Sequence, residues 1–142
     1  ITTKNIGYIM TIKQIYHSSL DKIEQFIIGN NGVHFGGYHS SLEAAYRKID
    51  DEDLNKNIYA YICEFDEKDF IELDDAGSHS EWIKSIEFAK KNGYKLIKYI
   101  NKYEPDKNPS YLFFCEENIP VIKDIKVSKF KEVEKILDQY YY

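Results

Sequence analysis

Apolar residues recur along the chain at the two spacings that distinguish strands from helices. Short runs that are apolar throughout, or that alternate between apolar and polar positions, predict strands over residues 11–16, 32–35, 58–65, 94–100, 110–115 and 120–127. A longer run with apolar residues three and four positions apart predicts a helix over residues 130–137. The chain is therefore expected to contain both element types from end to end.

Two further helices are marked by residues that commonly bound helices. Ser40 or Ser41 precedes apolar positions with helical spacing, which predicts a capped helix start. The Asn92-Gly93 pair follows an apolar series that includes Trp82, and it predicts a left-handed helix end. Strands and helices then follow one another without regular alternation, so the order favours an α+β class over a Rossmann fold or a barrel.

The strand over residues 58–65 is apolar on both of its alternating faces. Tyr59 and Tyr61 fall on one face, and Ile58 and Ala60 fall on the other. A strand of this kind is covered on both sides in the folded protein. We expect it to be the central strand of a sheet.

Length and composition limit the organisation of the protein. The 142 residues correspond to one ordinary domain, expected over residues 1–142. No run approaches the ~20 apolar residues that a membrane helix requires, so no membrane partner is expected. The first residues contain no basic region followed by an apolar run, which predicts a cytoplasmic location. Cys63 and Cys115 lie in apolar runs and are expected to be free thiols.

Charge and motif content exclude several classes of function. The net charge of -5 disfavours a protein that depends on attraction to a phosphate backbone. The chain lacks a GxSxG elbow, a Gly-rich loop ending in GKS or GKT, HExxH and CxxC. Its four histidines have no zinc-ligand spacing, so no metal site is expected.

Three short stretches at predicted strand ends carry the candidate chemistry. They are Tyr16-His17-Ser18-Ser19, then Gly32-Val33-His34-Phe35-Gly36-Gly37 leading into an Ala-containing stretch from Ser41, and then Tyr99 to Glu104 leading into the strand that starts at Ser110. In order and placement, the set resembles the ADP-ribosyltransferase superfamily, in the branch of poly-ADP-ribose polymerases and small bacterial and phage enzymes. The resemblance extends from His17 to about Val127.

This resemblance implies a fold and a co-substrate. Two short mixed β-sheets with flanking helices would form a split core and hold NAD in the cleft between them. His17 would hydrogen-bond ribose hydroxyls, and the backbone at Ser18, next to Ser19, would bind the nicotinamide amide. In the motif that begins at Gly32, His34 would stack on nicotinamide with Phe35 behind it in the core.

The position of the catalytic carboxylate has two candidates. In polymerase-like relatives a glutamate directly precedes the late apolar strand, and that place is Ser110 here. Asn101 and Glu104 resemble instead an Asn-x-x-Glu pattern of small bacterial and phage members. Glu104 is the preferred candidate, with a solvated loop charge as the alternative. Glu64 and Glu116 are the next candidates because each is expected at a strand end.

The resemblance implies a mono-ADP-ribosyltransferase, which moves ADP-ribose from NAD to a macromolecule. Such a reaction passes through an oxocarbenium-like state, which needs an anchored ribose, a bound leaving group and nearby negative charge. The acidic composition favours a protein acceptor over a nucleic acid, and a bacterial or phage effector, toxin or anti-defence factor is the natural setting. An NAD glycohydrolase is one alternative. A non-catalytic domain that binds NAD or a protein is the other, and Ser110 and His34 favour it.

Overall fold

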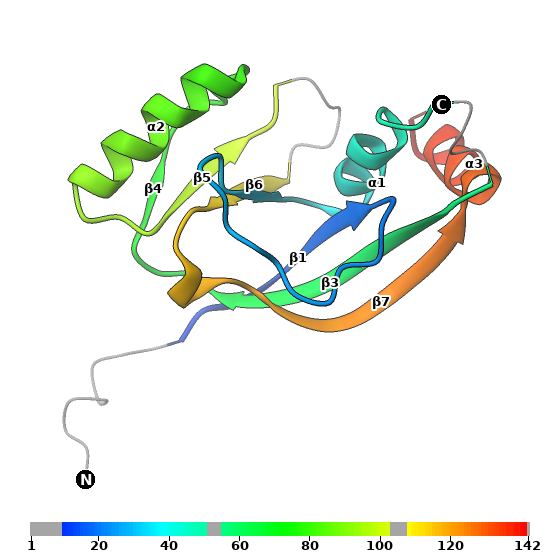
Figure 1. Ribbon diagram of the computed structural model, residues 1–142, viewed down its shortest axis with the longest axis horizontal. Coiled ribbons are helices and arrows are strands. Elements are labelled where there is room, and N and C mark those ends of the chain that lie inside the picture. The colour runs from blue at the N-terminus through cyan, green and yellow to red at the C-terminus, as the bar shows by residue number, and fades with distance from the viewer. Residues whose placement is uncertain (1–9, 51–54, 103–107, 142) are drawn as a thin grey trace, which may run out of the picture.

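Two small β-sheets and three α-helices make up the computed structural model, which describes residues 10–50, 55–102 and 108–141 (Figure 1). The first sheet has the order β1-β3-β7 and the second the order β2-β6-β5-β4. The protein therefore belongs to the α+β class. The strands are β1 (Ile12–Ser19), β2 (Val33–Phe35), β3 (Asn57–Asp66), β4 (Phe70–Glu72), β5 (Leu96–Ile100), β6 (Pro109–Phe113) and β7 (Val121–Lys129), and the helices are α1 (Tyr38–Tyr46), α2 (His79–Lys91), α3 (Phe130–Tyr141) and the 3-10 turn η3 (Glu116–Asn118).

Strand β3 is the centre of the first sheet, as its two apolar faces predicted. It pairs antiparallel with β1 on one side and β7 on the other. Tyr61 and Cys63 point into the core between the sheets, while Ile58 and Ala60 pack against α1 and α3. All four side chains are at most 2% exposed. The double burial explains why the strand has no polar face.

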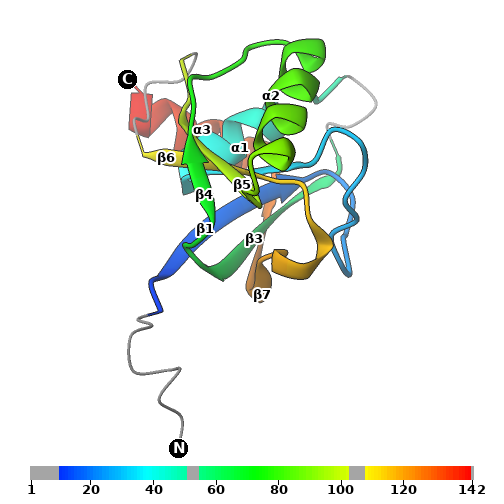
Figure 2. The same ribbon diagram turned by 90° about the vertical axis from the view of Figure 1, so that its left-hand side faces the viewer.

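The second sheet is covered by α2. Its helix residues Trp82, Ile86 and Ala89 pack against Ile97 of β5 and Leu112 of β6. Helix α2 lies at one end of the long axis of the molecule, and α1 and α3 lie at the other (Figure 1). Viewed along this axis, α2 lies in front of α1 and α3 (Figure 2).

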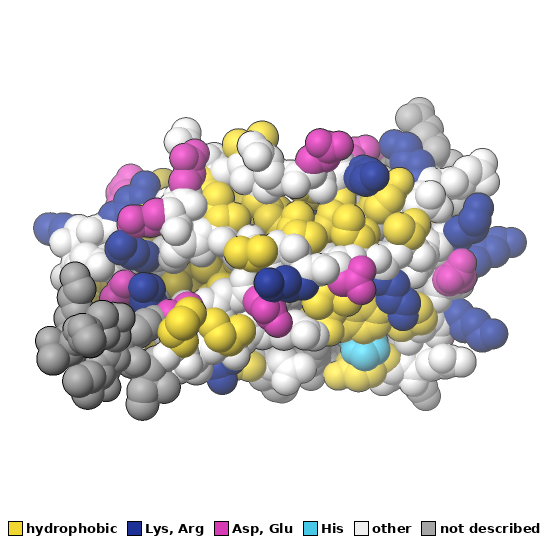
Figure 3. Space-filling view, turned by 90° about the horizontal axis from the view of Figure 1, so that it is seen from below, with side chains coloured by type: hydrophobic (Ala, Val, Ile, Leu, Met, Phe, Trp, Pro, Cys, Tyr) yellow, Lys and Arg dark blue, Asp and Glu magenta, His cyan; other side chains and the backbone are white. Residues whose placement is uncertain are grey.

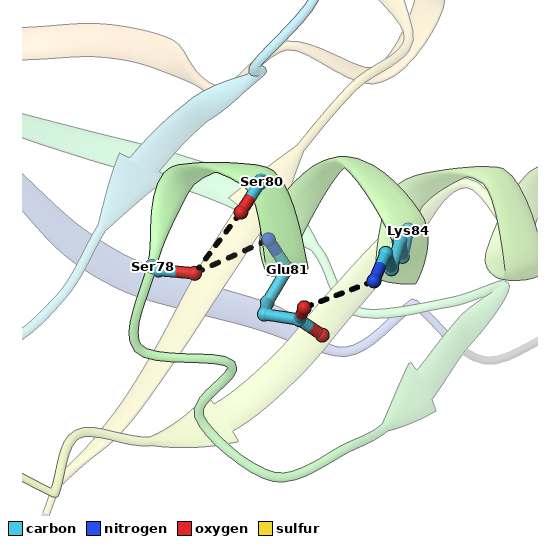
Figure 4. Close-up of polar contacts among 4 residues, drawn as sticks. All are labelled: Ser78, Ser80, Glu81 and Lys84. Carbon is cyan, nitrogen blue, oxygen red and sulfur yellow. Dashed lines mark hydrogen bonds and ion pairs between the residues drawn. The ribbon is translucent and has the colours of Figure 1, made fainter.

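The start of α2 is fixed by a side-chain cap. Ser78 Oγ accepts a hydrogen bond from the Glu81 backbone N–H at 3.3 Å, and Glu81 pairs with Lys84 Nζ at 3.0 Å (Figure 4). An N-cap serine satisfies a backbone donor that the first helical turn leaves unpaired. The cap thereby sets where Trp82, one residue later, meets the second sheet.

A pair of backbone hydrogen bonds joins the edges of the two sheets. Tyr16 of β1 donates its N–H to the Gly36 carbonyl at 2.8 Å, and Gly36 donates to the Tyr16 carbonyl at 2.9 Å. Phe35 lies beside this bridge and is 2% exposed in the core between the sheets, where its ring meets Phe113 edge to face. The bridge brings the end of β1 close to the start of α1.

A polar cluster also connects the sheets. Glu67, just after β3, accepts hydrogen bonds from the Tyr111 hydroxyl of β6 and from Lys98 Nζ of β5, the latter at 3.1 Å. Burial alone would raise the pKa of Glu67, but the bonds from Tyr111 and Lys98 outweigh it and hold that pKa below its usual value. The carboxylate is thus a charged link between the sheets.

Three expectations from the sequence are corrected. Strand β4 was not predicted. It has only three residues, which follow the turn at Asp69 (φ 54°) and are too few to show an alternating pattern of apolar and polar positions. Helix α1 starts at Tyr38 after Gly37, with no side-chain cap, and Ser41 Oγ instead donates to the Tyr38 carbonyl at 2.9 Å. Only the second sheet is mixed, through the parallel pair β4-β5, whereas the first is entirely antiparallel.

Charges of both signs share the face seen in Figure 3. Hydrophobic side chains gather along its middle, and Lys and Arg side chains are interspersed with Asp and Glu around them. The described residues of this face therefore form no continuous basic stripe of the kind that follows a phosphate backbone. None of the helices within the described ranges is long and apolar enough to cross a membrane.

Gly32, at the start of the second motif, allows a close approach that no other residue would. Its φ is +68°, and an added Cβ would lie 2.6 Å from Leu112 Cδ1 and 2.7 Å from the Phe113 carbonyl oxygen. Gly93 also has a positive φ, but its Cβ would meet nothing within 4 Å. A side chain at Gly93 would therefore cause backbone strain alone, whereas one at Gly32 would cause both backbone strain and steric overlap.

We predict that Gly32→Ala destabilises the protein more than Gly93→Ala. Strain alone costs Gly93→Ala about 1–2 kcal/mol of unfolding free energy, and the overlap with β6 adds to that cost only at Gly32. Urea denaturation of both variants measures the difference, with Gly29→Ala as a control because its Cβ meets nothing within 4 Å. Equal losses at Gly32 and Gly93 would contradict the close approach described here.

Candidate functional site

A cleft of about 620 Å³ lies where β1, β2 and α1 meet. Its volume is within the range of small-molecule binding sites. The segment after β1 supplies a further wall, through Ile23, Gln25, Phe26 and Ile27. The remaining lining residues are Tyr16, His17, Ser18, Gly32, Val33, His34, Phe35, Gly36, Ser40, Ser41, Ala44, Arg47, Lys48, Tyr99, Asn101 and Ser110.

His17 is oriented by a backbone carbonyl. Its Nδ1 lies 2.8 Å from the His34 carbonyl oxygen, and since a carbonyl can only accept, Nδ1 carries the proton and donates. Burial is the main cause that lowers the pKa of His17, so the ring is neutral near pH 7. In a neutral ring with Nδ1 protonated, Nε2 is an acceptor. His17 thus offers the cleft a fixed acceptor of the kind that a ribose hydroxyl can use.

Ser18 is attached to α1 through its side chain. Ser41 Oγ gives its one proton to the Tyr38 carbonyl, so in the 2.9 Å contact between the two serines Ser18 Oγ is the donor. This bond fixes the end of β1 against the first turn of α1. The Ser18 side chain therefore has a structural role.

The backbone of Ser18 points toward the cleft. β1 is an edge strand, so alternate residues direct their N–H and C=O away from β3. Tyr16 is one of these, because both of its groups bond to Gly36. Ser18 is two residues further along the same strand, so its N–H and C=O point the same way, beyond the end of the bridge. The strand end thus presents one donor and one acceptor side by side.

His34 lies against two aromatic side chains, those of Tyr99 and Trp82. Its Nδ1 is 2.7 Å from the Tyr99 hydroxyl, and its ring meets Trp82 edge to face with centroids 5.1 Å apart. Burial lowers the pKa of His34 to about 4, although the nearby charge of Asp75 opposes the shift in part. The ring is therefore neutral near pH 7 and can stack on an aromatic ligand without a charge of its own.

Ser110, the residue at the polymerase-like glutamate position, lies beneath Gly36 at the floor of the cleft. It is 4% exposed, and a Cβ on Gly36 would lie 3.0 Å from its Oγ. Because glycine has no Cβ, the Gly36 backbone can lie this close to the Ser110 hydroxyl. Its hydroxyl can supply a neutral hydrogen bond but no charge.

Asp75 anchors the chain segment that leads toward the other candidate. Its two carboxylate oxygens accept from the backbone N–H of Gly77 at 2.9 Å and of Lys102 at 3.0 Å. Asn101, next to Lys102, lines the cleft. Glu104 itself lies outside the described residues. The anchor fixes Lys102, which directly follows the cleft-lining Asn101.

The structure brings together most of the residues singled out from the sequence. His17, Ser18, Gly32, His34, Phe35, Asn101 and Ser110 all line the cleft. Ser19 does not, because its Oγ accepts from the Asp21 N–H at 3.1 Å in the turn after β1. Glu64 lies within β3, near Lys123, and Glu116 is in η3, so neither reaches the cleft. Among the described lining residues there is no carboxylate.

Sequence analysis gave no role to three lining residues with polar side chains, Tyr99, Arg47 and Lys48. Tyr99 opens the third strand-end stretch, in which only Asn101 and Glu104 were given roles. Arg47 follows Ala44 by three positions and Ser40 by seven, which is the spacing of one helix face, whereas Leu42 and Ala45 are buried on the other. The small residues on that face were a readable signal that it meets a cleft.

Metal and thiol chemistry find no support in the described part of the chain. It contains no group of three or more His, Cys, Asp or Glu placed to hold a metal ion. Cys63 and Cys115 are free, and burial raises the pKa of Cys63 to about 12, which keeps that thiol protonated and unreactive. Comparison with protein-family models, with curated proteins and with solved structures finds no match.

The buried neutral state of His34 predicts how stability depends on pH. The unfolded chain binds a proton at this residue below pH 6.5, but the folded protein does so only below about pH 4. The free energy of unfolding should therefore fall as the pH drops through this window, by about 3 kcal/mol for this group. Chemical denaturation of wild type and His34→Gln at several pH values isolates the contribution.

The stability difference between wild type and His34→Gln should shrink toward pH 4, because the variant has no imidazole to titrate. His39→Gln is the matched control, since that ring stacks on Tyr140 outside the cleft lining and is not among the charges that shift the pKa of His34. A difference for His34→Gln that stays constant from pH 7 to pH 4 would show that His34 is not held neutral by the fold.

Proposed function

We propose that the cleft binds NAD and that the protein is a mono-ADP-ribosyltransferase of the kind its motifs resemble. The observation that carries the proposal is the paired donor and acceptor of the Ser18 backbone, placed next to the neutral rings of His17 and His34. Three separate strand-end motifs of the sequence meet at this one cleft. Their chemistry matches the nicotinamide riboside half of NAD.

The nicotinamide carboxamide suits the end of β1. This group has an N–H donor and a C=O acceptor, which can bond to the Ser18 C=O and N–H as a neighbouring strand would. The ring would then lie between the strand end and His34, which Tyr99 and Trp82 hold in place. The ribose would follow next to His17 Nε2, which accepts from a hydroxyl.

The reaction breaks the bond between ribose C1′ and the nicotinamide nitrogen. The electron pair leaves with nicotinamide, C1′ takes on oxocarbenium character, and a nucleophile of the acceptor forms a bond to C1′ and loses its proton. Bonds from Ser18 to the leaving group hold nicotinamide in place as C1′ moves away. A carboxylate near C1′ would stabilise the developing positive charge, and Glu104 is our candidate for it.

One observation favours the non-catalytic alternative. The described lining contains no carboxylate, and the Ser110 hydroxyl can supply only a neutral hydrogen bond. If Glu104 does not face the cleft, the protein would bind NAD without turning it over. The composition, with a net charge of -5, favours a protein as acceptor for the active enzyme, and hydrolysis of NAD is the outcome when water takes the acceptor's place.

Incubation with NAD labelled in the adenylate, with and without a bacterial lysate, should release nicotinamide and label protein. Label on protein identifies a transferase, and nicotinamide release without label identifies a glycohydrolase. A rise in melting temperature with NAD but no release identifies a binding domain, since a ligand of the folded state stabilises it. No release and no thermal shift at millimolar NAD would refute NAD as the ligand.

Within an active protein, Glu104→Gln should lower kcat by about 100-fold or more with a small effect on NAD affinity. The carboxylate acts on charge that develops only in the transition state, so its loss affects turnover rather than binding. Ser110→Ala is the companion variant, and it should retain most of the activity. Full activity of Glu104→Gln together with an inactive Ser110→Ala would assign the role to Ser110 instead.

The His17→Ala variant should bind NAD about tenfold more weakly and remain folded, because the ring contributes a hydrogen bond to the ribose. Calorimetric titration with NAD measures the affinity, and circular dichroism checks the fold. His39→Ala is the control, as His39 stacks on Tyr140 outside the cleft lining. If the His17→Ala variant is unfolded, the role of the His17 ring is structural and not one in NAD binding.

A further inference from the structure

The cleft has a positively charged end, formed by Arg47 and Lys48 after the last turn of α1. We propose that these two side chains bind the diphosphate of the nucleotide and that Arg47 is the principal contact. The inference rests on the proposed function, because it assigns the part of the same ligand that follows the nicotinamide riboside. It extends that function to the class of ligand selected, namely nucleotides that carry a diphosphate.

The identity of Arg47 is the first argument. Among the 19 Lys and Arg residues of the chain it is the single arginine, and it lines the cleft. A guanidinium group presents N–H donors in a rigid fork that matches two phosphate oxygens at once, whereas an ammonium group acts as a point charge. All other basic residues of the chain are lysines, whereas the one arginine lines the cleft, where it can bind a phosphate group through two hydrogen bonds.

The shape of the cleft along α1 is the second argument. Ser40, Ala44 and Arg47 follow one another on the helix face that lines the cleft, and the first two are small. From Ser40 to Arg47 the helix rises about 10 Å, which is comparable with the span of a nucleoside. A ligand with its nicotinamide at Ser18, which is bonded to the first turn of α1, would therefore bring its diphosphate to the far end of the helix.

The charge of the cleft is the third argument. The protein carries a net charge of -5, yet the described lining residues include two cations and no carboxylate. The positive charge of Lys48 is close enough to His17 and His34 to contribute to the lowering of both pKa values. The described lining is thus positive within an acidic protein, as a binding site for an anionic ligand requires.

Cations at a helix C-terminus can also serve the fold, because they offset the helix dipole. Helix α2 provides the comparison, since it ends in Lys90 and Lys91, neither of which lines the cleft. The dipole accounts for positive charge at both helix ends. It does not account for an arginine at the one end that faces the cleft, and Lys91→Gln is therefore a matched control for Arg47→Gln.

Calorimetric titration of wild type, Arg47→Gln, Arg47→Lys and Lys91→Gln with three ligands tests the inference. The ligands are NAD, ADP-ribose, which keeps the diphosphate without nicotinamide, and nicotinamide riboside, which has no phosphate. Arg47→Gln should weaken NAD and ADP-ribose by about 10- to 100-fold and leave nicotinamide riboside unchanged. Arg47→Lys should recover part of the loss, and Lys91→Gln should bind all three ligands like wild type.

The inference is overturned if folded Arg47→Gln binds NAD and ADP-ribose like wild type, or if it loses nicotinamide riboside to the same extent. It is also overturned if wild type binds none of the diphosphate ligands at millimolar concentration. Binding of ADP-ribose that depends on Arg47, without release of nicotinamide from NAD, would support the inference and refute the proposed reaction. NAD cleavage that is unchanged in Arg47→Gln would support the proposed reaction and refute the inference.

Discussion

The backbone bridge between Tyr16 and Gly36 is the constraint on which the cleft depends. Its two hydrogen bonds, of 2.8 and 2.9 Å, join an edge strand of one sheet to the end of an edge strand of the other. Because the bridge stops there, the chain diverges beyond it. β1 continues to Ser18 while the chain after Gly36 turns into α1, and residues of both elements line the cleft. The bridge also leaves the Ser18 backbone without a strand partner on that side.

Other contacts hold the divergent parts in position. The Ser18–Ser41 hydroxyl bond connects the end of β1 to α1, and the bond from His17 to the His34 carbonyl connects it to β2. Both bonds occupy side-chain groups, so the Ser18 backbone and His17 Nε2 are left as the groups for ligand recognition. Neutral imidazoles follow from the burial of both rings. Arg47 and Lys48 supply the only charges in the described lining.

Much of this arrangement was predictable because its signals are local. The two-faced apolar pattern of β3 and the Asn92-Gly93 stop of α2 were read correctly, since each reflects burial or backbone conformation of neighbouring residues. Described residues of all three strand-end motifs line one cleft, whereas Glu104 lies outside the described residues. The start of α1 was misplaced because Ser41 looks like a cap in sequence, whereas its hydroxyl bonds back to Tyr38 and across to Ser18. A contact between residues 23 positions apart leaves no local pattern.

The central claim is that the Ser18 backbone binds a carboxamide, and an NMR titration of the labelled protein with nicotinamide alone tests it most directly. Hydrogen bonding at the Ser18 N–H should shift that amide resonance downfield more than those of residues on β7, none of which lines the cleft. Shifts at His17 and His34 should accompany it. If nicotinamide binds but the Ser18 amide does not respond, or if no resonance moves at millimolar concentration, the account of the site is contradicted.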